Sequence, residues 1–146
     1  ASDLKRKSFN YSATKTNNKY IFSFNGSDSI FTSKNLKNWK GFFCKSSHMP
    51  NDLAEYLGTD DVREIMHNKI RSSRYSTLTW DPYRRLIYRF YILGQEIKPT
   101  DNVFDLYHYP SYFGIMVINE NMEIIADEVF EKNNLLILYY RTILIL

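Results

Sequence analysis

Alternation of hydrophobic and polar positions predicts a chain built mainly of β-strands. Aromatic residues occupy every second position in residues 19–24, and a second apolar run follows at 29–33. Asn25-Gly26 lies between them, and this dipeptide favours a type I′ hairpin turn because both central residues of that turn need a positive φ. We therefore expect a β-hairpin here and a further strand at 39–44.

The second half of the chain repeats the β pattern over a longer stretch. Residues 75–92 alternate on both sides of a proline-containing turn at 81–84. The run at 113–119 is apolar on both faces, which suits an inner strand, whereas the acidic run at 122–130 suits a strand nearer an edge. These strands should form one antiparallel meander with an irregular insert at 94–112.

Helical spacing interrupts the β pattern between the two halves. Apolar residues recur three and four apart at 52–57 and again at 61–70. Asp61 and Glu64 have the spacing of a capping box, which favours a helix that begins there. We expect two short helices whose apolar stripe packs on the sheet, within an all-β (β-dominated) fold of antiparallel meander sheets.

The faces of the longest strand decide which side chains should be buried. Leu86 and Tyr88 share one face, while Arg85 and Arg89 share the other. We take the face without arginine as the core, so the arginines flank a solvated or subunit-facing surface. The alternative is a patch for an anionic ligand, built from these arginines and Arg84. The expected core comprises Tyr20, Phe22, Phe24, Trp80, Leu86, Tyr88, Phe90, Ile115, Val117 and Ile124.

Length and composition indicate a single domain. The chain has 146 residues, of which 44% are hydrophobic, with an extended lead-in at 1–18, the β region at 19–134 and an apolar tail at 135–146. A formal net charge of +3 is too small to indicate nucleic acid as a partner. The tail is too short to span a membrane. It should instead pair with an open sheet edge, within the chain or across a homodimer, unless a truncated or frame-shifted gene explains it.

The sequence contains no recognisable catalytic or metal-binding constellation. Cys44 is the only cysteine and lies on an apolar segment, where a thiol behaves as a small buried hydrophobe. His48, His67 and His108 lack the paired spacing of metal ligands, and no phosphate-binding glycine motif occurs. We expect neither a cofactor nor a metal, and no enzymatic activity. Asp127 and its acidic neighbours show no spacing that marks them as catalytic carboxylates.

One aromatic segment remains as a candidate ligand site. Residues 105–114 bring together Tyr107, His108, Tyr109 and Tyr112 in what should be a loop. Rings of this kind stack on sugars or on apolar groups of another protein, although they can equally close the end of a sheet. The candidate binding residues are therefore these four together with Arg85 and Arg89.

The strands "YSTLTWDPYRRLIYRFYI" and "FGIMVINENMEIIADEVF" resemble a blade of bacterial cell-envelope proteins and lipoproteins with a TolB-like six-bladed β-propeller. The resemblance covers roughly residues 19–130. It implies a radial array of antiparallel sheets, of which this chain would hold roughly two to three. It also implies a location in the periplasm or at the cell surface, often with a lipid anchor, and it brings no site residues.

Together these observations favour a non-catalytic cell-envelope scaffold or binding module with a protein or glycan partner. The alternative is a glycan-binding or glycan-acting protein that uses the aromatic segment at 105–114.

Overall fold

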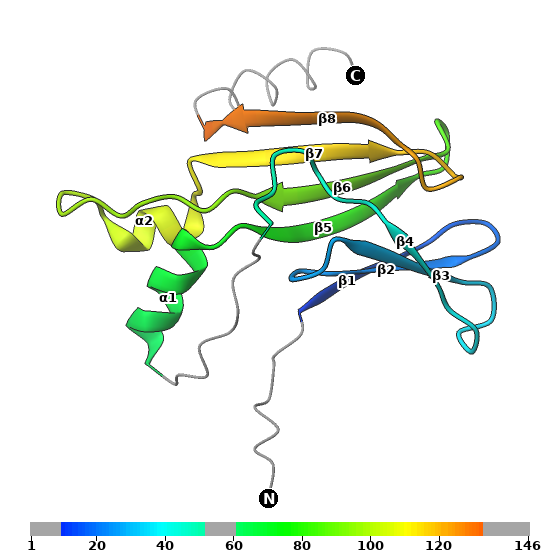
Figure 1. The fold of residues 1–146 in the computed structure, drawn as a ribbon, viewed down its shortest axis with the longest axis horizontal. Coiled ribbons are helices and arrows are strands. Elements are labelled where there is room, and N and C mark those ends of the chain that lie inside the picture. The colour runs from blue at the N-terminus through cyan, green and yellow to red at the C-terminus, as the bar shows by residue number, and fades with distance from the viewer. Residues whose placement is uncertain (1–9, 52–60, 133–146) are drawn as a thin grey trace, which may run out of the picture.

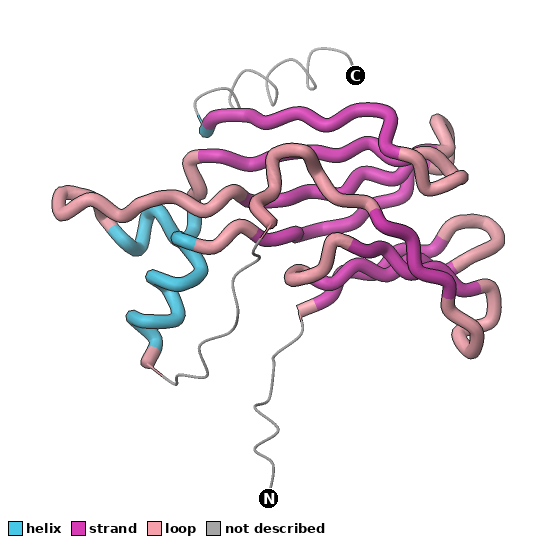
Figure 2. Tube along the Cα trace, viewed as in Figure 1, coloured by secondary structure: helices cyan, strands magenta, loops and turns pink. Residues whose placement is uncertain are grey.

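The computed structural model describes residues 10–51 and 61–132, which form two four-stranded antiparallel sheets and two short helices (Figures 1 and 2). The first sheet contains β1 (Tyr11–Lys15), β2 (Tyr20–Phe24), β3 (Ser29–Ser33) and β4 (Lys40–Phe43). The second contains β5 (Arg74–Asp81), β6 (Leu86–Ile92), β7 (Tyr112–Ile118) and β8 (Ile124–Glu131). The helices are α1 (Val62–Arg71) and α2 (Val103–His108). The all-β fold predicted from the sequence is confirmed.

The first sheet is a meander whose central hairpin, β2 and β3, forms as expected. The turn of this hairpin is not of type I′, because neither Asn25 nor Gly26 has a positive φ. Instead, the N–H of Ser27 donates to the carbonyl of Phe24, and the carbonyl of Asn25 accepts from the N–H of Tyr75 in the second sheet. The hydrogen bond to the second sheet thus fixes the conformation of this turn, which the Asn-Gly preference alone did not predict.

The second sheet confirms the four-strand meander, with β7 between β6 and β8. The turn after β5 is closed by the Asp81 carboxylate, which accepts from the N–H groups of Tyr83 and Arg84 at 2.9 and 3.0 Å. Arg85 then enters β6 with a φ of 57°. The insert expected to be irregular contains α2, whose first turn is capped by the side chain of Asn102.

The hydrophobic core lies between the inner faces of the two sheets. Ile21 and Ile30 contribute from the first sheet, and Ile87 and Met116 contribute from the second. The remaining buried hydrophobic members of this cluster are Cys44, Met49, Tyr75, Leu78, Tyr91, Ile118 and Met122. Because β2 and β6 each bury alternate residues, the side chains between these positions point away from the core.

The expected core was therefore assigned to the wrong face of the strands. Nine of its members are half-buried, namely Tyr20, Phe22, Phe24, Trp80, Leu86, Tyr88, Phe90, Ile115 and Val117, and Ile124 is exposed. Trp80 is the exception, because it pairs with the buried Ile87 and packs against the border of the buried cluster. Both faces of β2 and β6 carry large apolar side chains, so alternation identifies the two faces without showing which one is covered. We chose the face without arginine, whereas Arg89 is fully buried.

The helix at 62–71 begins where the sequence predicted, because the Asp61 carboxylate accepts from the N–H of Arg63 at 2.8 Å. Its packing differs from the prediction: Val62 is exposed, Ile70 is the buried residue of the helix, and α1 contacts α2 beyond the end of the second sheet (Figure 1). Because Ile70 is the one buried residue of α1, the apolar stripe of this helix does not pack on the sheet along its whole length. The helix expected at 52–57 and the tail at 135–146 lie outside the described residues.

Gly114 should be essential to the packing of the two sheets. A Cβ atom at this position would lie 1.9 Å from Cζ of Tyr91, whose hydroxyl is held by the Asp127 carboxylate. The ring cannot move aside without breaking that hydrogen bond. We expect Gly114→Ala to lower the free energy of unfolding by about 3 kcal/mol, measured by thermal unfolding. Gly26→Ala is the control, because it meets no atom within 4 Å and should not lower stability.

Candidate functional site

The most unusual feature of the interior is the guanidinium of Arg89, which β6 directs between the two sheets. Its Nε donates to Oγ of Ser23 at 2.9 Å, and its terminal nitrogens donate to the carbonyls of Cys44 at 2.9 Å and Ser27 at 2.5 Å. The guanidinium carbon lies 3.3 Å from the centroid of the Tyr75 ring, a cation–π contact. One side chain of the second sheet is therefore bonded to three segments of the first.

Arg89 has no ion-pair partner among the described residues. Oriented carbonyl and hydroxyl oxygens and an aromatic face take the place of a carboxylate, which keeps the buried charge hydrogen-bonded. Burial lowers the pKa of Arg89 to about 10, while Tyr75, Cys44 and Asp28 oppose the shift. The guanidinium consequently remains charged at neutral pH.

Two carboxylates extend this arrangement through tyrosine hydroxyls. The hydroxyl of Tyr75 donates to Asp28 at 2.7 Å and accepts from the N–H of Ser46 at 3.2 Å. The hydroxyl of Tyr91 donates to Asp127 at 2.8 Å. Burial, reinforced by these carboxylates, raises the pKa of both tyrosines, so each keeps its proton well above neutral pH.

Asp127 joins β8 to the segment that follows β4. Its carboxylate accepts from the hydroxyl of Ser46 at 2.9 Å and from the N–H and hydroxyl of Ser47 at 2.8 and 2.9 Å. Burial acts to raise the pKa of Asp127, but the hydrogen bonds from Tyr91 and the two serines outweigh it and lower the pKa. We call Arg89, Tyr75, Asp28, Tyr91, Asp127 and their serine partners the inter-sheet network.

The polar atoms of the inter-sheet network form hydrogen bonds with one another. Cys44 is buried as predicted, its thiol donates to the carbonyl of Met122 at 3.5 Å, and burial raises its pKa, which disfavours a reactive thiolate. Over residues 10–51 and 61–132, no three His, Cys, Asp or Glu side chains come together as metal ligands. The hydrogen bonds of this network hold the two sheets together.

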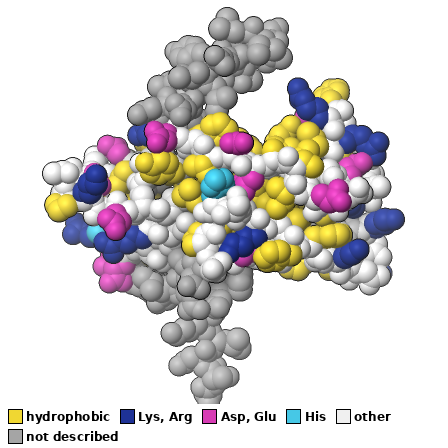
Figure 3. Space-filling model, turned by 45° about the horizontal axis from the view of Figure 1, so that its top comes forward, with side chains coloured by type: hydrophobic (Ala, Val, Ile, Leu, Met, Phe, Trp, Pro, Cys, Tyr) yellow, Lys and Arg dark blue, Asp and Glu magenta, His cyan; other side chains and the backbone are white. Residues whose placement is uncertain are grey.

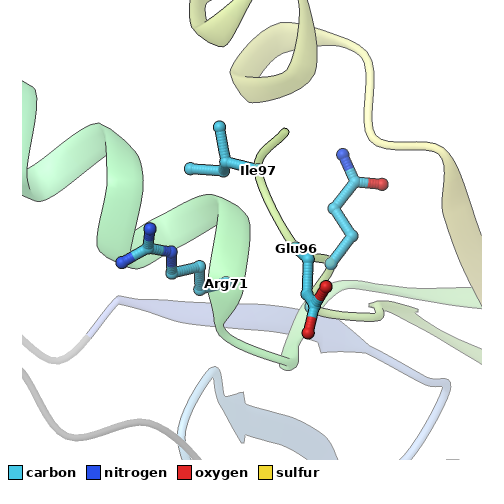
Figure 4. A pocket seen from close by; sticks show the side chains of 5 residues that line it. Arg71, Glu96 and Ile97 are labelled. Atoms are coloured by element: carbon cyan, nitrogen blue, oxygen red, sulfur yellow. The ribbon is translucent and has the colours of Figure 1, made fainter. Parts of the chain in front are cut away.

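Surface hollows lie away from this network. An open depression of about 500 Å³ is lined by residues 94–97 and Arg71 at the end of α1. In Figure 4 the side chains of Arg71, Glu96 and Ile97 diverge and do not meet at a common ligand position. This depression has no convergent polar groups of the kind that fix a small ligand.

The structure separates the residues that the sequence offered as a binding site. Tyr107 and His108 end α2, and the His108 ring contacts those of Tyr107 and Tyr109, whereas Tyr112 begins β7. Arg85 lies at the opposite end of β6. At the rise of an extended strand it is about 23 Å from Ile92, the last residue of β6. The expectation of a shared surface for Arg85 and Arg89 is wrong, because Arg89 points into the core.

The aromatic segment at 105–114 contains the end of α2 and the start of β7 and carries exposed rings, where the sequence predicted a loop. Tyr107 is tied to α1, since Nζ of Lys69 donates to its hydroxyl at 3.3 Å. The His108 ring packs on Phe104 at 4.3 Å, and Tyr109 is 60% exposed. Exposed rings at one end of the second sheet can contact a ligand, and Nζ of Lys132 lies 5.2 Å from the centroid of the Tyr109 ring.

Sequence reasoning missed Asp28, Tyr75, Asp127 and the serines of the inter-sheet network. The available signal was weak: Ser23 interrupts an otherwise aromatic and aliphatic strand, and Arg89 interrupts another. A polar residue at the centre of an apolar strand is as typical of an exposed face as of a bonded interior. Only the spatial pairing of the two strands distinguishes these cases.

Comparison with known proteins gives a family and a fold. A family model described as a domain of unknown function (DUF4221) matches residues 2–109. The chain also resembles a crystal structure of a DUF4221 family member from Bacteroides vulgatus, with a TM-score of 0.68 and 23% identity. That alignment covers 84% of this chain and 34% of the other, so this chain spans about a third of its relative's length. No curated protein matches the sequence.

Arg89 should be the largest single contributor to stability among the charged residues described. Arg89→Ala removes the donors from the Ser27 and Cys44 carbonyls and should lower the free energy of unfolding by about 3 kcal/mol or more. Arg89→Lys keeps the charge but not the planar set of donors, so its loss should be intermediate. Urea denaturation measures both variants.

The control for Arg89 is Arg85→Ala, which removes an exposed ion pair to Glu120 and should cost less than about 1 kcal/mol. Equal stability of the Arg89 and Arg85 variants would contradict the assignment.

The lowered pKa of Asp127 predicts a stability that depends on acid pH. The unfolded chain titrates this group near its ordinary pKa of 3.8 and the folded chain below it, so unfolding takes up a proton in that range. Stability should fall as the pH drops below about 4 through the folded pKa. Asp127→Asn should flatten this part of the curve, measured by urea denaturation at several pH values. Glu128→Gln, on the outer face of β8, should leave the dependence as it is in the wild type.

Proposed function

We propose a function for this chain, which belongs to the DUF4221 family of domains of unknown function. It forms part of a non-catalytic scaffold or binding module of the bacterial cell envelope. Its place would be the periplasm or the cell surface. The observation that carries the proposal is the inter-sheet network. Among its ionisable groups, Arg89 and Tyr75 bond directly to the region of the first sheet, and Tyr91 is linked to that region through Asp127 and Ser46.

The repeated sheets support an arrangement like that of a β-propeller. Each sheet is a four-stranded meander in chain order, and the first strands of the two sheets contact each other. The N–H of Leu78 in β5 donates to Oγ of Ser12 in β1 at 2.9 Å. Adjacent blades of a propeller meet in this way, along their first strands and their faces. The two sheets would then be consecutive blades of a longer TolB-like array.

The outer faces of the sheets fit the same arrangement. On the first sheet, the ring of Phe22 lies 6.0 Å from that of Tyr11, and Phe24 packs against Phe31 at 5.7 Å. On the second, Phe113 stacks on Phe130 at 5.4 Å. A face that is aromatic and only half-buried is typical of a surface that another sheet or a partner covers.

A second candidate function is glycan binding at the end of α2, where the exposed rings of Phe104, Tyr109 and Tyr112 favour it. Such rings can stack on the apolar face of a sugar. Saturable oligosaccharide binding that is lost in Tyr109→Ala would support this candidate over a purely structural function.

The scaffold proposal predicts that function follows folding. In a bacterium that carries the gene, Tyr91→Phe and Asp127→Asn remove hydrogen bonds of the inter-sheet network without adding bulk. We expect the phenotype of each variant to decline only in proportion to the amount of folded protein in the envelope fraction. Immunoblotting of that fraction measures the amount, and Glu128→Gln is the matched control. A variant with normal abundance and stability but no function would indicate catalysis and contradict the proposal.

A further inference from the structure

Four segments lie at the end of the molecule opposite the two helices (Figure 1). They are the connections 16–19, 82–85 and 119–123 and the segment 34–40, which includes the first residue of β4, and we call them the turn surface. Nζ of Lys19 donates to the carbonyl of Glu120 at 2.9 Å, and the Glu120 carboxylate pairs with Arg85 at 2.5 Å. Tyr20 pairs with Ser33 across β2 and β3, so Lys19 and Lys34 lie beside each other just beyond that pair. The turn surface is therefore continuous across both sheets.

Positive charge is concentrated in the part contributed by the first sheet. Residues 10–51 contain six lysines against one acidic residue, Asp28, and four of these lysines, Lys19, Lys34, Lys37 and Lys40, lie on the turn surface. Asp28 belongs to the inter-sheet network, beyond the opposite end of β2. The segment 34–40 alone carries three lysines, none of which forms an ion pair with a described residue. Figure 3 shows Lys and Arg side chains at this end of the molecule, beside hydrophobic side chains.

The segment 34–40 has a defined shape. The side-chain oxygen of Asn35 accepts from the N–H groups of Lys37 and Asn38, both at 3.0 Å. Leu36 is held at a φ of 62°, and every residue from 34 to 40 is exposed. The Trp39 ring rests on Phe22. A non-glycine residue in the left-handed region, held by an Asx-type turn, presents its side chain in a fixed direction.

Exposed apolar side chains lie among these cations. Leu36 is 50% exposed, Trp39 is 43% exposed, and Tyr83 on the neighbouring turn is 94% exposed. Lysines beside exposed Trp, Tyr and Leu are typical of segments that lie in the interface of a membrane, where the cations meet headgroups and the rings enter the boundary with the acyl chains. A nucleic acid would instead favour a basic groove lined by stacking rings.

We propose that the turn surface, led by residues 34–40, docks this chain onto an anionic lipid bilayer. Lys34, Lys37 and Lys40 contact the headgroups, and Leu36 and Trp39 enter between them. The proposal rests on the envelope module proposed above, for which it names the membrane-facing end. The inter-sheet network is separate from this surface, so its variants leave the lysines in place.

Vesicle sedimentation with the full chain tests the docking. Binding is expected to phosphatidylcholine vesicles that contain phosphatidylglycerol, and not to phosphatidylcholine alone. The triple variant Lys34→Gln, Lys37→Gln and Lys40→Gln should bind about 100-fold more weakly, at about fivefold per lysine. The matched control is Arg63→Gln, Arg71→Gln and Lys98→Gln, which removes the same charge at the helical end and should bind like the wild type. Equal loss in both triple variants would overturn the proposal.

Tryptophan emission tests whether the apolar side chains enter the bilayer. The chain has two tryptophans, and Trp80→Phe leaves Trp39 as the reporter. Its emission should shift to shorter wavelength with anionic vesicles, and not with a soluble polyanion such as heparin or single-stranded DNA. Tighter binding to either polyanion than to vesicles, without an emission shift, would identify another partner and overturn the proposal. A different outcome is vesicle binding by the wild type together with a Tyr91→Phe variant that is folded and abundant but has no function. That outcome would reject the scaffold function and leave the docking proposal in place.

Discussion

A buried cation that has no carboxylate ion-pair partner within residues 10–51 and 61–132 is the constraint on which this structure depends. The Arg89 guanidinium can remain charged between the sheets only while its N–H groups meet oxygen atoms at hydrogen-bonding distance. Those atoms come from β2, from the turn after β2 and from the end of β4. A displacement of one sheet against the other would leave the charge unsatisfied, so the requirement of one side chain fixes the positions of three segments distant in sequence.

Seven of the eight strands in the described residues, and their order, could be predicted because they depend on local patterns, whereas β1 (Tyr11–Lys15) lies in the stretch that was expected to be an extended lead-in. The alternation in residues 75–92, the Asp81 turn and the Asp61 cap all follow from contacts within a few residues. Which face is covered depends instead on what packs against it. Arg89 made one face look solvated, and only the carbonyl groups of another sheet make that position suitable for burial. A hydrophobicity pattern has no means to represent a partner that lies 66 residues away in the chain.

The candidate site was predictable to the extent that its members are neighbours in sequence. Tyr107, His108 and Tyr109 lie together because the last two helical residues of α2 and its C-cap carry them. Arg85 and Arg89 were grouped wrongly. Alternation assigns both residues to one face of the strand, but it does not show that Arg85, a turn residue, lies beyond the edge of the packed sheet. Asp127 could not be found at all, because its significance comes from the two serines after β4 and from Tyr91.

The division between interior and ends follows from these contacts. The inter-sheet network fixes the strands, so the segments that connect them start and finish at set positions and need little further ordering to meet a partner. At one end of β6, Arg85 is exposed and bonded only at the surface, whereas Arg89, four residues later, is enclosed. Surface segments tolerate substitution because few contacts depend on them. Specificity in this fold can therefore change at the connecting segments without altering the interior that holds them in place.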